Sequence, residues 1–164
     1  MANKVYKIDE TSITWTDTTG DLAMTLNNLA AGTGRQGAQK DLGAVATARS
    51  RRYRWRCIVQ QDTAGVVGEV IRVYLKRGDG TYYDNDDGTG DAAVSAEDKL
   101  RNCLLLGILQ VDEAVADVNI SKEGEVEISC RYVIPIIWNA TADNLQATNN
   151  VNVFILTPDP DEIQ

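Results

Sequence analysis

The strongest constraint on the fold of this chain is an alternation of apolar and polar residues, at a period of two, in several separate stretches. The clearest stretch covers residues 52–60, where aromatic residues and a cysteine alternate with arginines. Similar stretches cover residues 125–134 and 12–29, the latter divided by a turn at residues 18–21. Successive side chains of a strand point to opposite faces of its sheet, so the pattern predicts strands with one buried face.

Three further apolar stretches, at residues 70–77, 104–111 and 151–156, are also predicted to be strands. Gly107 interrupts the second of them and indicates a bulge or a close approach of another group. Pro135 has no backbone N–H to donate, so the strand that contains it should reach an edge, a bulge or an end there.

Turn-forming residues separate these stretches. Residues 52–60 and 70–77 are expected to form a hairpin. Residues 30–43 are rich in glycine and alanine and are predicted to be a loop, because several glycines would destabilise a helix. Residues 79–97 are rich in Asp, Asn, Gly and Thr, which predicts a long exposed loop with one helical turn beginning near Ser95.

The 164 residues are therefore expected to form one all-β domain. About seven or eight strands and no long helix favour an antiparallel β-sandwich or a jelly-roll-like barrel, with an extended N-terminal segment. Residues 1–43 are interpreted as a possible arm and loop, and residues 157–164 as an acidic tail.

Composition argues against several classes of function. The chain has no histidine, which removes the usual general base and argues against an enzyme. Its three cysteines have no metal-binding spacing, so we expect small buried apolar residues and no cofactor or metal. The net charge of −8 disfavours nucleic acid as a partner. No apolar run approaches the roughly 20 residues of a membrane span, and no secretion signal is visible, so synthesis in a cytoplasm is expected.

The acidic stretch Asp84–Asp91 is a candidate calcium site because calcium prefers several oxygen ligands. EF-hand spacing fails, however: with Gly88 at the sixth position, Tyr83 occupies the first ligand position. Clusters of Asp, Asn and Gly are also typical of exposed turns. The sequence favours a solvated loop and leaves calcium binding open.

One basic run is the candidate contact site of the chain. It consists of Arg49, Arg51, Arg52, Arg54 and Arg56. The first interpretation is a solvated strand face paired with acidic neighbours; the second is a contact with an acidic partner subunit. Nucleic-acid binding by phosphate contacts and base stacking is the third, and it is disfavoured because the alternation places arginines and aromatic rings on opposite faces.

Four sets of segments are informative together. They are Trp15-Thr16 with residues 21–26, residues 35–38 with 41–43, the arginine-rich stretch with residues 73–75, and residues 132–135 with Trp138-Asn139, Leu145 and residues 156–158. In these segments the chain resembles capsid decoration, or cement, proteins of tailed phages, which are small β-rich domains on the outer capsid lattice. The resemblance covers most of the chain and assigns a role to no single residue.

The resemblance implies a structural virion protein that binds the outer surface of a capsid and bridges major capsid subunits. A homo-oligomer, a trimer or dimer, is expected, with residues 1–43 and the basic strand face in contact with the lattice. Part of residues 1–43 would then become ordered on binding. The alternatives are a tail, neck or fibre-attachment component of the virion, and a non-viral ligand-binding β-sandwich, for which Tyr82-Tyr83 is the only candidate aromatic cluster.

Overall fold

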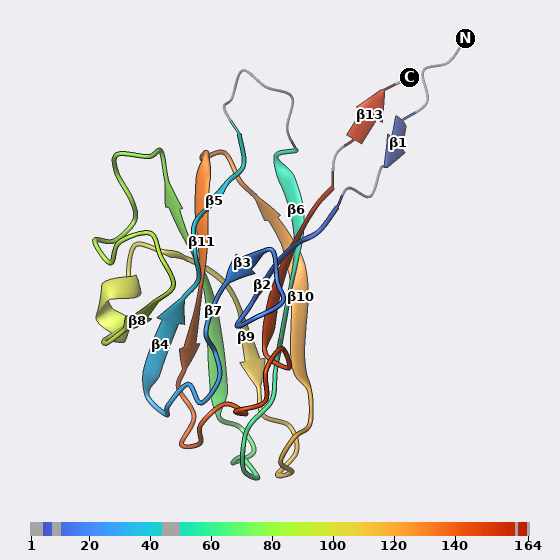
Figure 1. The fold of residues 1–164 in the computed structure, drawn as a ribbon. Coiled ribbons are helices and arrows are strands. Elements are labelled where there is room, and N and C mark those ends of the chain that lie inside the picture. Colours follow the sequence, from blue (N-terminus) through green and yellow to red (C-terminus); the bar gives the residue numbers. More distant parts are fainter. Residues whose placement is uncertain (1–4, 8–10, 44–49, 160, 164) are drawn as a thin grey trace.

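A computed structural model describes residues 5–7, 11–43, 50–159 and 161–163 as two sheets packed into a sandwich (Figure 1). One sheet has five strands: β2 (Ile13–Thr16), β3 (Leu22–Ala23), β6 (Arg52–Val59), β10 (Ile120–Glu127) and β12 (Val153–Pro158). The other has six: β4 (Thr33–Gln36), β5 (Lys40–Asp41), β7 (Val70–Gly78), β8 (Ala92–Val94), β9 (Leu104–Gln110) and β11 (Tyr132–Asn139). The predicted all-β sandwich is confirmed.

The strand order is β10-β6-β12-β2-β3 in the five-stranded sheet and β8-β4-β11-β7-β9 in the six-stranded sheet, where β5 also pairs with β11. Every described pair is antiparallel except β2 with β3. Strands β1 (Val5–Lys7) and β13 (Asp161–Ile163) form a separate ribbon at one end of the sandwich (Figure 1). The described residues include no helix that is long and apolar enough to cross a membrane.

The main core fills the space between the two sheets. The inward side chains of β6, which include Tyr53, Trp55 and Cys57, are buried there as the alternation predicts. Trp15 of β2 meets Phe154 of β12 edge to face, with 5.7 Å between the ring centroids. Aromatic pairs in this geometry add about 0.5–1.5 kcal/mol beyond the area that they bury.

Trp55 lies between two glycines, one from each sheet. A Cβ atom placed on Gly107 of β9 would lie 2.7 Å from Cη2 of the indole, and one on Gly124 of β10 would lie 2.8 Å from Nε1. The register of β9 against β7 also shifts between Val73 and Tyr74, next to Gly107. Both features predicted for Gly107, a bulge and a close approach, are therefore confirmed.

The predicted hairpin of β6 and β7 is wrong, because the two strands belong to different sheets. The predicted strand over residues 125–134 is also two strands: β10 ends at Glu127, and β11 begins at Tyr132 in the opposite sheet. Ile128 and Ile134 are both buried across this crossing. The alternation continues because both sheets bury their inner side chains in the same core.

Residues 11–43 are extended, but they belong to the sandwich and do not form an arm. Trp15, Met24 and Leu26 are fully buried, and β4 and β5 occupy the segment that was predicted to be a loop. A Cβ on Gly34 would lie 2.7 Å from the Trp138 ring, and one on Gly37 would lie 2.7 Å from Trp15. These glycines therefore serve close packing.

Pro135 lies inside β11, opposite the interruption between β4 and β5. Its carbonyl accepts a hydrogen bond from the N–H of Gly37, and the paired residues on that side are 136–139 with β4 and 132–133 with β5. A strand residue directs its N–H and C=O to the same side, so the missing donor falls where the partner strand is interrupted. This explains how an interior strand accommodates a proline.

Residues 79–97 are mostly exposed turns and bends, as predicted, but they include the strand β8 and the buried Val94. Together with residues 98–103 they lie over the outer face of the six-stranded sheet. Val94, Leu100 and Cys103 pack against Ile136 and Trp138 of β11 in a second core cluster. The predicted helical turn is a 3-10 helix, η1 (Glu97–Leu100). At the C-terminus, Asp159 of the predicted acidic tail is buried beside Arg52, with 3.3 Å between Oδ2 and Nε.

The contact between Trp55 and Gly107 generates a stability prediction. Gly107→Ala should lower the free energy of unfolding by about 1–3 kcal/mol, because the added methyl group overlaps a buried ring that has no free space. Gly90→Ala is the matched control, since a Cβ there meets nothing within 4 Å. Urea unfolding of both variants tests this prediction. Equal unfolding midpoints for Gly107→Ala and Gly90→Ala would show that Gly107 does not confine the Trp55 ring.

Candidate functional site: the outer face of the five-stranded sheet

The alternation of β6 places its arginines on the outer face of the five-stranded sheet. Arg54 and Arg56 are exposed, Arg52 is half-buried, and Arg51 is exposed just before the strand. Arg49 lies outside the described residues. The structure thus brings the arginines of β6 together in one row.

A row of glutamates from β10 stands beside the arginine row. The register pairs Arg52 with Glu127, Arg54 with Glu125 and Arg56 with Glu123. Directly opposed side chains of opposite charge contribute roughly 0.2–1 kcal/mol each in antiparallel sheets. The interpretation of a strand face paired with acidic neighbours therefore has direct support in the register.

Sequence reasoning missed these glutamates as part of the site. Their spacing was the available signal, because Glu123, Glu125 and Glu127 repeat the two-residue spacing of the arginines with opposite charge. Pairing β10 with β6 in the observed register matches all three charges.

A neutral strip from β12 and β2 borders the charged rows. Thr157 pairs with Arg54 and Ile155 with Arg56. The hydroxyls of Ser12 and Thr157 are 2.7 Å apart and share a hydrogen bond. An open hollow of about 560 Å³ runs across this face, lined by Ser12, Arg54, Trp55, Arg56, Glu123, Gly124, Glu125, Ile155 and Thr157. Below, "the charged face" means the side chains of Arg52, Arg54, Arg56, Glu123, Glu125, Glu127 and Thr157.

Three of the four acids of the 84–91 stretch are directed toward separate cations and do not converge on one point. Asp84 accepts hydrogen bonds from the N–H and Nε of Arg77, at 2.9 and 3.0 Å. Asp87 accepts one from Nζ of Lys99 at 2.9 Å. Among the described residues, no group of three or more Asp, Glu, Cys or His side chains could hold a metal ion.

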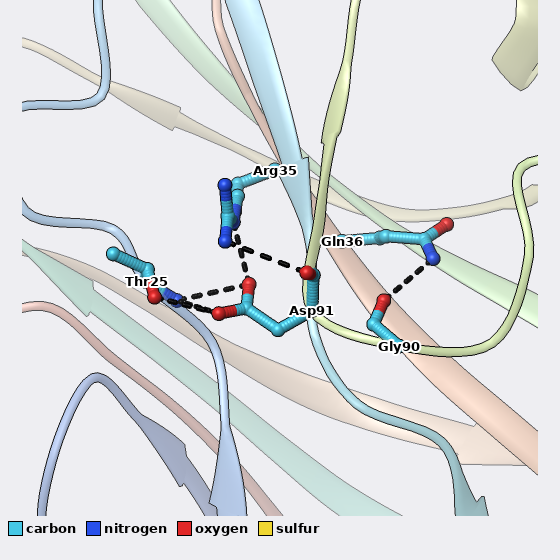
Figure 2. Close-up of polar contacts among 5 residues, drawn as sticks. All are labelled: Thr25, Arg35, Gln36, Gly90 and Asp91. Carbon is cyan, nitrogen blue, oxygen red and sulfur yellow. Dashed lines mark hydrogen bonds and ion pairs between the residues drawn. The ribbon is translucent and has the colours of Figure 1, made fainter.

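Asp91 fastens this stretch to the N-terminal segment and to β4 (Figure 2). Its carboxylate accepts hydrogen bonds from the N–H and hydroxyl of Thr25, the latter at 2.6 Å, and from Nε of Arg35 at 2.5 Å. Beside it, the amide nitrogen of Gln36 donates to the carbonyl of Gly90 at 2.7 Å. Burial alone would raise the pKa of Asp91, but the hydrogen bonds from Arg35 and Thr25 outweigh it and hold the pKa below its ordinary value.

The buried thiols are poorly suited to nucleophilic chemistry. Burial raises the pKa of Cys57 to about 12 and that of Cys103 to about 11, so both thiols stay protonated near neutral pH. Cys130 is half-buried, and its thiol donates to the carbonyl of Tyr132. These cysteines act as small packing residues.

The network around Asp91 generates a prediction about pH. A carboxyl with a lowered folded-state pKa stabilises the fold above its unfolded pKa, about 3.9, and that contribution is lost as pH falls through the folded pKa. Asp91→Asn should therefore lower the free energy of unfolding by about 1–3 kcal/mol at pH 7. The deficit should shrink at pH 3.

Urea unfolding at the two pH values measures this effect. Asp86→Asn, which removes an exposed carboxylate of the same stretch, is the matched control and should change little. A deficit for Asp91→Asn that is the same at pH 7 and pH 3 would contradict the assigned role.

No protein-family model matches this chain, and no curated protein matches it. Solved structures match this chain only weakly, as two examples show. One is the structure of the Clostridium thermocellum N-terminal endo-1,4-β-D-xylanase 10B, CBM22-1–GH10 modules, complexed with xylohexaose. It is 10% identical in sequence, the match covers 92% of this chain and 25% of that chain, and the TM-score is 0.34. The other is the C-terminal domain of EclA, a sugar-binding protein: 11% identity over 100% of this chain and 79% of that one, TM-score 0.30. These similarities are too low to carry an argument about function.

Proposed function

We propose that this chain is a structural protein of a tailed-phage virion that binds the outer capsid surface and bridges major capsid subunits. The observation that carries the proposal is the difference between the outer faces of the two sheets. Residues 79–103 lie over one face, whereas the charged face leaves Arg54, Arg56 and its three glutamates exposed. We infer the partner, the major capsid protein, from the resemblance of the sequence to decoration proteins.

The charged face suits a protein partner. Its two rows of opposite charge can meet complementary rows on another protein, and such complementarity gives specificity and orientation. Ion pairs between such exposed, opposed charges contribute only about 0–1 kcal/mol each in water, so a partner can displace any that form at little cost. The net charge of −8 opposes a nucleic-acid partner.

Copy number in purified particles tests the proposal first. Quantifying this chain against the major capsid protein should give a fixed, large ratio if it decorates the lattice. A few copies per particle would replace the capsid proposal with a tail, neck or fibre-attachment role. Absence from particles would overturn the virion proposal and leave a soluble binding module.

Exchange of one charge pair tests the contact surface. The double variant R54E/E125R keeps an opposed pair and the net charge, so it should fold normally. It should nevertheless bind particles that lack this chain roughly tenfold or more weakly, because the two charges of this pair are exchanged and no longer match those of the partner. Binding is measured by co-sedimentation of purified protein with such particles.

The matched control exchanges a pair on the other side of the molecule. Arg101 and Asp98 of the η1 region are both 73% exposed and lie 3.9 Å apart, so D98R/R101E makes the same kind of change there. This control should bind like the wild type. Equal binding by both exchange variants would exclude the charged face as the contact.

Self-association is expected through β9, one of the two edge strands of the six-stranded sheet. Residues 102–111 carry no charge, and Leu105 and Ile108 are 45% and 41% exposed. The neighbouring edge strand β10, in contrast, carries Lys122 and three glutamates, which is how edges are normally protected. The neutral edge is where two copies of a chain with a charge of −8 can meet without repulsion, as an antiparallel pair.

Sedimentation equilibrium over a range of concentrations tests this association. The wild type should form dimers, and Ile108→Lys should shift the population to monomer, because each copy would then bring a positive charge to the interface. Tyr82→Lys, at a side chain that is 77% exposed on another part of the surface, should not. A wild type that stays monomeric throughout would remove β9 as an interface.

A further inference from the structure

Three exposed valines belong to two connections at one end of the sandwich. Val66 and Val67, in the β6–β7 connection, are 56% and 58% exposed, and Val115, in the β9–β10 connection, is 52% exposed. Figure 1 shows these connections side by side, at the end opposite the β1–β13 ribbon. We call these three side chains the valine tip. Grouped exposed apolar residues mark interaction sites more often than isolated ones do.

Hydrogen bonds at their bases hold the two loops together. The N–H of Gly68 donates to the carbonyl of Val111, and the N–H of Val111 donates to the carbonyl of Glu69, both at 2.9 Å. The N–H of Asp117 donates to the carbonyl of Gln61 at 3.1 Å. The tip is therefore preformed, so little conformational entropy is lost when a partner covers it.

The first loop is also fixed to the neighbouring 139–146 segment. The hydroxyl of Thr63 donates to Asp143 at 2.6 Å, and the carboxylate of Glu69 accepts from the N–H of Ala142 at 3.0 Å. Gly65 packs so closely on the buried Gln61 side chain that a Cβ would lie 1.8 Å from Oε1. The exposed position of Val66 and Val67 is thus set by packing on both sides.

The charge around the valine tip has one sign. The four connections at this end, residues 24–32, 60–69, 111–119 and 140–152, contain no Lys or Arg. Their acids are Asp62, Glu69, Asp112, Glu113, Asp117 and Asp143. Asp62, Asp112, Glu113 and Asp117 are exposed. The valine tip therefore belongs to connections whose charged residues are all acidic, and we call these acids the acidic rim.

We infer that the valine tip is a second protein-binding surface, whose partner presents an apolar pocket rimmed by lysines and arginines. The acidic rim attracts such a pocket and repels anionic lipid headgroups, nucleic acid and the tip of another copy. An apolar centre within a polar rim is also the usual anatomy of an interface hot spot. The inference rests on the proposed function, since bridging two capsid subunits needs a second surface besides the charged face.

The test uses the same particles that lack this chain. The triple variant V66S/V67S/V115S should bind them about tenfold or more weakly than the wild type, because anchors in desolvated pockets dominate binding. Tyr82→Ser, at an exposed side chain away from this end, is the control and should bind normally. Thermal unfolding should give the same midpoint for all of these proteins, since the substituted side chains are exposed.

A second variant tests the acidic rim. D112N/E113Q should weaken the salt dependence of binding, whereas D86N/D98N, which removes two charges elsewhere, should leave it unchanged. Normal binding by the triple variant, with weak binding by R54E/E125R, would overturn the inference and retain the proposed function. No binding by the wild type would overturn both.

Vesicles of phosphatidylcholine with phosphatidylglycerol form a separate arm of the test. The wild type should not bind them, because the acidic rim and the lipid carry the same sign of charge. Binding that the triple variant loses would replace the protein partner by a membrane and overturn the inference.

Discussion

The contact of Trp55 with two glycines is the constraint on which the rest of the structure depends. Its indole occupies the space that a side chain at position 107 or 124 would take. The two glycines therefore let β9 and β10 pack directly against the ring. With Trp55 pointing inward, the pleat directs Arg54 and Arg56 outward. The positions of the glutamates are set in the same way. Gly124 lies opposite Trp55, so Glu123 and Glu125 on either side of it lie opposite arginines of β6. One packing contact thus sets the register of the charged face.

The two sheets then differ in what covers their outer faces. Val94, Leu100 and Cys103 bury the centre of one face, and Asp91 fastens the covering segment to Thr25 and Arg35. Asp84, Asp87 and Asp91 are therefore engaged in holding the chain together, although their sequence is that of an exposed turn or a calcium loop. On the other sheet, matched charges replace a covering segment. They keep the face soluble and specific, and they leave it accessible to a partner.

Sequence patterns predicted which side chains are buried better than they predicted which strands are neighbours. The alternation in β6 and the close approach at Gly107 depend on local stereochemistry, and both were found. The prediction for Pro135 was wrong: it lies inside the interior strand β11, and the interruption is in its partner, between β4 and β5. A period of two identifies the buried face of a strand, but it does not state which sheet the strand joins. For this reason the β6–β7 hairpin and the single strand over residues 125–134 were wrong. Glycines at 34 and 37 suggested a loop because their packing partners, Trp138 and Trp15, are distant in sequence.

The charged face and the valine tip would contribute differently to binding, the first to specificity and orientation and the second to affinity. Exposed ion pairs are worth about 0–1 kcal/mol each, so a charged face selects and orients a partner more than it holds one. Burying a valine fully is worth about 1.5–3 kcal/mol, and the tip side chains have roughly half of that still to gain. Three such side chains, already held in place by their loops, can supply affinity that the charged face lacks. A protein with both surfaces can contact two neighbours weakly and still be retained, because the second contact forms at high effective concentration once the first is made.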